Sequence, residues 1–298
     1  CLYLPLGFVH PPYQVEEPFF SMHGREEVPD PIPAEPGAKR KYARVLHKAH
    51  GIDKLGTEDL KEIKRVYFGM VSRIDRQVGQ IVEKLKEEGL YEDTIIALFS
   101  DHGDYTGDYG LIEKYLCGFE DCMLHVPLML RGPGVPSGPA REGLCEMTDL
   151  YPTLMELVGL EPRHRHFGRS LGPALRGEEE GPRDVVFAEG GYHPEQRKKF
   201  QVEIPEDHIY WHMARAAAEH PDMARRVMMV RTERWKYVYS PREEDELFDL
   251  EKDPDELENL AGNPEHGGTV EGLRERLLRW MLDTGDVLPP QRDPRGWE

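Results

Sequence analysis

The chain has 298 residues, of which 39% are hydrophobic and 32% charged, so it is long enough to bury a core without disulfide or metal support. At roughly 150 residues per domain, this length predicts one large domain or a large and a small one. Lys and Arg total 38 against 56 Asp and Glu, and the net charge of −18 argues against nucleic acid and anionic membranes as partners.

The first forty residues predict a strand followed by a long loop. Residues 1–9 are apolar and predict a buried strand, although Pro5 within it suits an edge or a bulge. Prolines are frequent between residues 10 and 40, which predicts a long ordered loop. Because the chain opens at Cys1 without an initiator Met, we expect it to be the C-terminal portion of a longer protein.

The clearest helix is predicted for residues 58–88. Apolar residues recur there at intervals of three and four: Leu60, Ile63, Tyr67, Met70, Ile74, Val78, Ile81 and Leu85. Thr57 is a candidate N-cap and Gly89 a candidate stop. Residues 94–100 follow as a continuous apolar strand, typical of strands buried on both faces of a parallel sheet. A helix that leads into such a strand is an α/β unit.

The remaining elements divide into two groups. Residues 126–130 predict a second strand, 148–158 a helix and 159–184 a connector. Further on, the pattern predicts a β-hairpin (227–231 and 234–239), a strand (246–250), a short helix after Asp253-Pro254 and a closing amphipathic helix from Val270 to Met281. We therefore expect an α/β fold with a mainly parallel sheet flanked by helices over residues 1–184. A small α+β subdomain with an antiparallel sheet and a closing helix follows over residues 185–298.

Strand 94–100 runs directly into Ser100-Asp101-His102-Gly103-Asp104. Ligands bind at the carboxyl ends of strands in open α/β sheets, and an Asp oxygen and a His nitrogen can both hold a divalent metal. Taken alone, Asp-His-Gly is short enough to recur by chance, with Asp101 capping a turn and His102 in solvent.

The wider sequence resembles the sulfatase family of the alkaline phosphatase superfamily. Residues 94–135 are similar to its strand ending in Ser-Asp-His-Gly-Asp, followed by Gly-x-x-Gly-Leu, a Lys and a Val-Pro-Leu strand ending in Gly-Pro-Gly. Residues 7–13 resemble its strand ending in His-x-Pro-Tyr, and residues 70–79 its long helix. Residues 230–239 and 246–260 resemble its C-terminal subdomain, so the ordered set covers nearly the whole chain.

The resemblance implies a role for four residues. Asp101 and His102 would be metal ligands, most often to Ca2+; Lys114 would contact the sulfuryl oxygens; and His10 would contact the ester near its leaving oxygen and help to protonate it. A metal, a Lys and a protonated His stabilise the negative charge that ester cleavage concentrates on these oxygens. The implied substrate is a small-molecule or saccharide sulfate ester.

The family nucleophile is a formylglycine made from Cys or Ser in Cys/Ser-x-Pro-Ser-Arg. None of the four cysteines, Cys1, Cys117, Cys122 and Cys145, lies in that context, and the paired Asp metal ligands that the family has near the start of its domain are also absent. Since Ca2+ takes six or more oxygen ligands, two residues make an incomplete site. We expect this chain alone to lack sulfatase turnover and to bind metal weakly.

Two alternatives remain open at this point. A phosphate or phosphonate ester hydrolase of the same superfamily would use the same metal, Lys and His. The chain could instead be a non-catalytic module that binds anions or a partner. An aromatic-rich segment at 190–226, with Tyr192, His193, Tyr210, Trp211 and His212, is a candidate for shaping substrate choice. Oligomeric state and cellular compartment are not indicated by the sequence.

Overall fold

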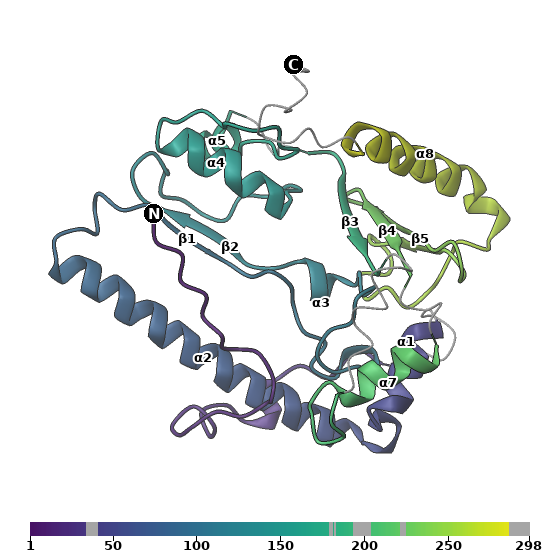
Figure 1. Cartoon of the computed structure of the whole chain (residues 1–298). Helices are drawn as coiled ribbons and strands as arrows, with labels where there is room; N and C mark the ends of the chain where they lie inside the picture. The colour runs from purple at the N-terminus through teal and green to yellow at the C-terminus, as the bar shows by residue number, and fades with distance from the viewer. Residues whose placement is uncertain (34–40, 179–180, 182, 193–203, 221–224, 286–298) are drawn as a thin grey trace. The chain divides into compact units, whose positions relative to one another are not determined.

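The computed structural model describes residues 1–33, 41–178, 181, 183–192, 204–220 and 225–285 (Figure 1). The chain divides into two compact units. Unit 1 comprises Cys1–Asp93, His102–Val126 and Gly191–Arg226; unit 2 comprises Thr94–Asp101, Pro127–Gly190 and Val227–Glu298. Both units draw residues from either side of position 184, so this division differs from the sequence-based one, which stays a prediction.

Unit 1 is built on a long helix. Its helices are α1 (Lys41–Ala49), α2 (Thr57–Glu87), α3 (Asp121–Leu124) and α7 (Trp211–Glu219). Helix α2 confirms the periodicity of its apolar residues, but its N-cap is Gly56 rather than Thr57, and the Gly56 amide donates to Asp59 Oδ2 at 2.9 Å. Gly89 follows the helix with φ of +69°, a left-handed conformation that Gly adopts without strain and that stops a helix.

The prediction of a strand at residues 1–9 is wrong. These residues are not in a strand, and the apolar side chains near the terminus, Leu2 among them at 80% relative exposure, lie in solvent. Apolar composition alone does not make a strand, because backbone groups need a partner strand and Pro5 has no N–H to donate. The loop is tied to α2 instead, with the Arg73 guanidinium 4.2 Å from the Phe8 ring centroid and that of Arg65 4.6 Å from Phe20.

In unit 2, β1 (Ile96–Phe99) and β2 (Leu128–Arg131) form a two-stranded sheet. They pair antiparallel, with Ile96 opposite Arg131 and Phe99 opposite Leu128. This pair is antiparallel, within a fold for which we expected a mainly parallel sheet. The reason is the connection between them, which contains only the 3-10 turn η3 (Asp108–Gly110) and the single-turn α3. A parallel pair needs a crossover, usually a full helix, to return the chain to the starting edge. Two short helices follow, α4 (Leu150–Leu157) and α5 (Gly172–Arg176).

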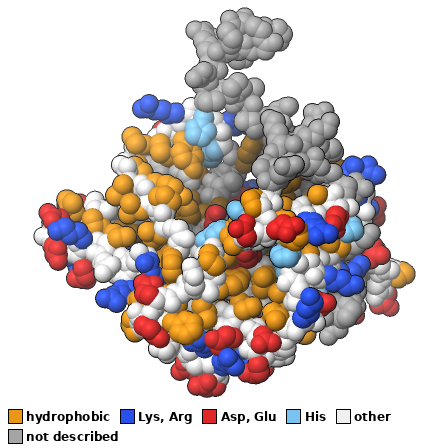
Figure 2. All heavy atoms as spheres, turned by 60° about the horizontal axis from the view of Figure 1, so that its bottom comes forward, with side chains coloured by type: hydrophobic (Ala, Val, Ile, Leu, Met, Phe, Trp, Pro, Cys, Tyr) orange, Lys and Arg blue, Asp and Glu red, His pale blue; other side chains and the backbone are white. Residues whose placement is uncertain are grey.

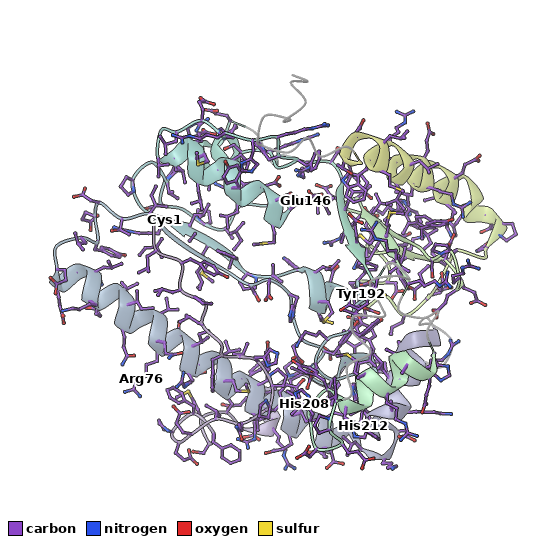
Figure 3. All side chains as sticks on the ribbon, in the orientation of Figure 1. Cys1, Arg76, Glu146, Tyr192, His208 and His212 are labelled. Carbon is purple, nitrogen blue, oxygen red and sulfur yellow. The ribbon has the colours of Figure 1, made fainter. Side chains whose placement is uncertain are left out.

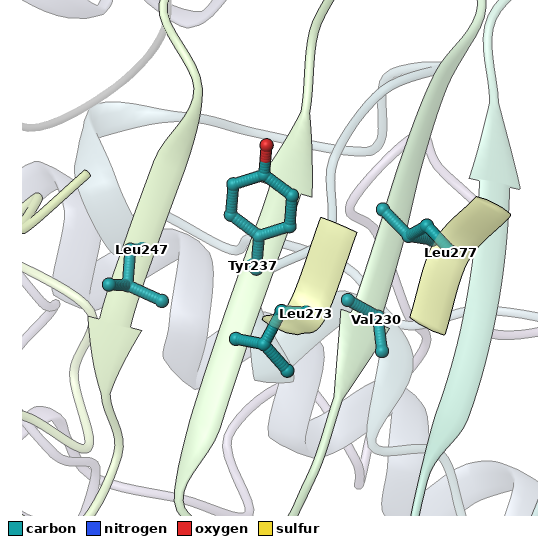
Figure 4. Close-up of a cluster of buried hydrophobic side chains, with 5 residues drawn as sticks. All are labelled: Val230, Tyr237, Leu247, Leu273 and Leu277. Carbon is teal, nitrogen blue, oxygen red and sulfur yellow. The ribbon is translucent and has the colours of Figure 1, made fainter. Parts of the chain in front are cut away.

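A four-stranded antiparallel sheet with a closing helix confirms the expected C-terminal subdomain. Its strands in order are β3 (Val186–Gly190), β4 (Val227–Arg231), β5 (Trp235–Tyr239) and β6 (Glu246–Asp249), and α8 (Gly267–Thr284) closes it. Figure 4 shows the buried side chains between sheet and helix: Val230, Tyr237 and Leu247 from the strands, Leu273 and Leu277 from α8. The prediction of a short helix after Asp253-Pro254 is wrong, since residues 251–260 form turns and coil.

The other face of β5 buries a charged pair. Successive residues of a strand point to opposite faces, so Lys236 lies on the face opposite Tyr237. Its ammonium donates to Glu256 Oε1 at 2.8 Å, and both side chains are at most 1% exposed. At the surface, the face drawn in Figure 2 carries acidic and basic side chains interspersed with apolar ones. None of the helices in the described part of the chain is long and apolar enough to cross a bilayer.

Candidate functional site

Three side chains from distant parts of unit 1 meet at hydrogen-bonding distance. His10 follows the N-terminal coil, Lys114 lies in the loop after η3, and Tyr210 immediately precedes α7. Lys114 Nζ lies 3.0 Å from His10 Nε2, and the Tyr210 hydroxyl lies 2.6 Å from the same nitrogen. Lys114 Nζ also donates to the Tyr210 hydroxyl at 3.1 Å. The structure therefore brings together His10 and Lys114, two residues predicted to share a site, and adds a tyrosine.

The orientation of the His10 ring follows from its other nitrogen. His10 Nδ1 lies 2.8 Å from the carbonyl oxygen of Pro11, which can only accept, so Nδ1 carries the hydrogen. In the neutral ring Nε2 is then the acceptor, and it faces Lys114 and Tyr210. When Nε2 also carries a proton, the ring donates at that atom. This geometry lets His10 either accept or supply a proton at the cluster.

The loop that carries Lys114 is held in an unusual backbone shape. Thr106, Tyr109 and Glu113 have positive φ, a conformation that costs energy for residues other than Gly and persists only under surrounding constraints. One constraint is Asp108, which accepts from the buried Lys64 ammonium of α2 at 2.6 Å and from the Ile32 amide at 2.9 Å. The loop is thus fastened to α2 and to the N-terminal segment before it reaches Lys114.

A second hydrogen-bonded network reaches the residue next to Lys114. The Tyr13 hydroxyl donates to Asp104 Oδ1 at 2.7 Å and accepts from the Glu113 amide at 2.7 Å, while the Thr106 amide donates to the same Asp104 oxygen at 2.9 Å. Burial raises the pKa of Asp104, against the lowering effect of these hydrogen bonds and of Lys114 and His102. Burial likewise raises the pKa of Tyr13 and of Glu113. Tyr13 thereby links Asp104 to the backbone next to Lys114.

His102 is positioned by its own turn. Its Nδ1 lies 2.8 Å from the Gly103 carbonyl oxygen, so Nδ1 carries the hydrogen and Nε2 is the basic nitrogen, the arrangement suited to a metal ligand. Gly103 is required here because a Cβ at this position would clash with the Cys122 carbonyl oxygen. The Gly103 amide donates to the Met123 carbonyl at 2.8 Å, which fastens the turn.

Asp101, the second predicted ligand, is an exposed residue at the boundary where unit 2 gives way to unit 1. Within the described residues, no three His, Cys, Asp or Glu side chains gather closely enough to hold a metal ion. The donor chemistry of Asp101 and His102 suits a divalent metal, but two residues do not complete the coordination shell that Ca2+ requires. The described residues therefore do not fit a complete metal site.

The sequence assigned no role to Tyr13 or Asp104, and it named Tyr210 only as one of several residues that shape substrate choice, not as a neighbour of His10 and Lys114. Tyr13 and Asp104 lie within the motifs quoted above, but only tertiary structure shows that they contact each other, 91 residues apart. Tyr210 was one of several aromatic residues in the 190–226 segment. Of the others, Trp211 and His212 lie on α7, with the His212 ring 6.3 Å from His50, and His193 lies outside the described residues. His212 and His208, which flank Tyr210, are labelled in Figure 3.

Comparison with known proteins identifies the family of both parts of the sequence. Residues 3–160 match the Sulfatase family, and residues 191–282 match the family described as N-sulphoglucosamine sulphohydrolase, C-terminal. The first match spans more than half of the chain and includes His10, the Asp101-His102 pair and Lys114. The second includes Tyr210.

The names of similar proteins refer to the hydrolysis of more than one kind of ester. The chain is 28% identical to choline-sulfatase of Rhizobium meliloti over 310 residues, covering 100% of the chain and 54% of that protein. It is 27% identical over 303 residues to the multifunctional alkaline phosphatase superfamily protein PehA of Trinickia caryophylli, covering 95% of the chain and 56% of that protein. The crystal structure of phosphonate monoester hydrolase of Agrobacterium radiobacter matches with a TM-score of 0.71 and 29% identity, over 92% of this chain and 55% of that one.

The chain thus spans about half the length of the curated relatives it matches. The solved structures confirm the expected alkaline phosphatase-like fold class, and the antiparallel C-terminal sheet agrees with it. On these matches, the chain belongs to the sulfatase family of the alkaline phosphatase superfamily.

Proposed function

We propose that this chain forms the ester-binding and leaving-group part of a hydrolase that cleaves sulfate esters. The observation that supports the proposal is the 3.0 Å approach of Lys114 Nζ to His10 Nε2, two residues 104 positions apart in sequence. A fixed ammonium stabilises negative charge on sulfuryl oxygens, and an imidazole beside it can protonate a leaving oxygen. Relatives named as sulfatases match almost the entire chain.

The nucleophile is proposed to lie outside this chain, because none of its four cysteines is in the formylglycine context. One sequence partly resembles that context: Ser137-Gly138-Pro139-Ala140-Arg141 shares its serine, proline and arginine. All five residues are exposed loop residues of unit 2. We therefore expect the 298-residue chain to show no turnover of 4-nitrophenyl sulfate by itself.

Asp101 and His102 are proposed as two ligands of a divalent metal, Ca2+ by resemblance to the family. When bound, such an ion would polarise the ester oxygens as a Lewis acid. Because the described residues supply too few ligands, we expect the chain alone to bind Ca2+ only at about millimolar concentration or above. Asp101→Asn combined with His102→Gln should weaken that binding further, which calorimetric titration with CaCl2 would measure.

A phosphate or phosphonate ester hydrolase is the second candidate. It is favoured by the likeness to phosphonate monoester hydrolases of Agrobacterium radiobacter and Silicibacter pomeroyi. The same Lys114 and His10 would serve a phosphoryl group, since its oxygens also concentrate negative charge in the transition state.

Two measurements on the purified chain test the proposal. Titration with inorganic sulfate and, separately, phosphate should show binding that Lys114→Met removes; the absence of sulfate binding, or binding that survives Lys114→Met, would contradict the proposed site. Tighter binding of phosphate than of sulfate would favour the second candidate. In the turnover assay, activity towards 4-nitrophenyl sulfate that is lost in Ser137→Ala would overturn the placement of the nucleophile outside the chain.

A further inference from the structure

Tyr210 contacts two of the predicted site residues but was not itself among the four. Its hydroxyl contacts both His10 Nε2, at 2.6 Å, and Lys114 Nζ, at 3.1 Å. Its ring also meets the His10 ring edge to face, with centroids 6.1 Å apart. The tyrosine therefore touches both groups that would hold an ester, and it does so with its polar atom.

The cluster has more donors than acceptors. A Lys ammonium brings three N–H donors and no acceptor, and the Tyr210 hydroxyl brings one donor and an oxygen that accepts from Lys114 at 3.1 Å. The neutral His10 ring offers only the single lone pair of Nε2, because Nδ1 donates to Pro11. Lys114 Nζ and the Tyr210 hydroxyl both lie within 3.0 Å of Nε2, whose one lone pair can accept a good hydrogen bond from only one of them. An anionic oxygen at this point would accept from both and relieve the competition.

The hydroxyl of Tyr210 is held in place from α7. Tyr210 is the N-cap residue of this helix, and its backbone amide donates to His208 Nδ1 at 3.2 Å. The preceding turn is closed by two backbone hydrogen bonds, from His208 to Pro205 and from Trp211 to His208. Helix α7 packs against α1, and Ala216 within it is buried. The segment therefore presents Tyr210 from an ordered support.

We propose that Tyr210 is a substrate-contacting residue whose hydroxyl donates a hydrogen bond to the anionic group of the ester bound by Lys114 and His10. This inference rests on the proposed function of that site. On binding, the O–H turns from His10 Nε2 towards the anion, and the freed Nε2 can take up a proton from solvent that His10 then gives to the leaving oxygen. Helix α7 thereby supplies a direct determinant of substrate affinity from a part of the chain outside the motifs that carry Lys114 and His10.

Substitution Tyr210→Phe tests this, because it removes the hydroxyl and keeps the ring. In calorimetric titration of the full chain with inorganic sulfate, we expect the dissociation constant to rise about tenfold or more, the usual loss for one hydrogen bond to a charged group. Tyr3→Phe is the matched control, since Tyr3 is 72% exposed, and it should bind sulfate as the parent chain does. The thermal midpoint of Tyr210→Phe should stay that of the parent.

A second readout separates a direct contact from a structural one. The 15N signal of His10 Nε2, assigned with His10→Gln, should shift on sulfate addition in the parent chain, because the hydrogen bond from Tyr210 leaves it. In Tyr210→Phe that sulfate-dependent shift should shrink. A fall in sulfate affinity that accompanies a lowered thermal midpoint, with the Nε2 response unchanged, would overturn the proposal.

The outcomes separate this inference from the proposed function. If sulfate binds, Lys114→Met removes the binding, and Tyr210→Phe binds as the parent does, the role of Tyr210 is wrong and the proposed site stands. If sulfate does not bind the parent chain, or Lys114→Met leaves the binding intact, the proposed site fails and the role of Tyr210 fails with it.

Discussion

The cost of removing the Tyr13 hydroxyl, on a half-buried side chain, can be worked out from its two hydrogen bonds. Tyr13→Phe removes the bond donated to Asp104 at 2.7 Å and the bond accepted from the Glu113 amide at 2.7 Å. A hydrogen bond to a charged group contributes about 1.5–3 kcal/mol, and a bond between neutral groups about 1 kcal/mol. With Asp104 ionised, we expect unit 1 to lose about 3 kcal/mol of unfolding free energy.

The loss should depend on pH. Burial raises the pKa of Asp104 above its ordinary value of 3.8, so in the window just above 3.8 the folded protein holds a proton that the unfolded chain has released. Stability linked to this group is therefore highest at low pH and declines as pH rises through the raised pKa. Once Asp104 is protonated, Tyr13 faces a neutral partner, and the cost of Tyr13→Phe should fall to about 2 kcal/mol, two ordinary hydrogen bonds.

Urea denaturation followed by circular dichroism at 222 nm measures this, because the 31-residue α2 of unit 1 contributes strongly to the signal. Measurements at pH 7 and at pH 3.5, below the ordinary value of 3.8, with Tyr3→Phe as the exposed control, give the two differences. Equal losses at both pH values, or a loss below about 0.5 kcal/mol at pH 7, typical of an ordinary surface substitution, would refute the reasoning.

Two further predictions concern packing. Lys236→Met should destabilise unit 2 by about 3–5 kcal/mol, because the buried Glu256 loses its ion-pair partner. The double variant Lys236→Met with Glu256→Leu should recover most of that loss, since no buried charge is left. Equal stability of the single and double variants in urea titrations would contradict the ion-pair argument. Gly103→Ala should lower the free energy of unfolding by about 1–3 kcal/mol and disturb the adjacent His102, since its Cβ meets the Cys122 carbonyl oxygen. The control Gly138→Ala, with open space around it, should change the thermal midpoint little. Similar midpoints for both variants would disprove the clash.

The sequence by itself determined the elements whose pattern is local. Helix α2 and the strands β4, β5 and β6 follow from periodicity, and Trp235, Tyr237 and Tyr239 alternate along β5 as their packing against α8 requires. The order of the motifs also indicated the family and assigned His10 and Lys114 to the same site. Helix periodicity and strand alternation are properties of neighbouring residues, so no tertiary contact is needed to recognise them.

Only the tertiary structure decided the features that depend on contacts between distant residues. Strand pairing is one, and the apolar residues 1–9 form no strand because a strand exists only with a partner. The antiparallel pairing of β1 with β2 is another, set by the connection between them. The contact of Tyr210 with His10, 200 residues away, is the third. A side chain's chemistry can be read from its type, but which groups share its hydrogen bonds is fixed by how the chain folds back on itself.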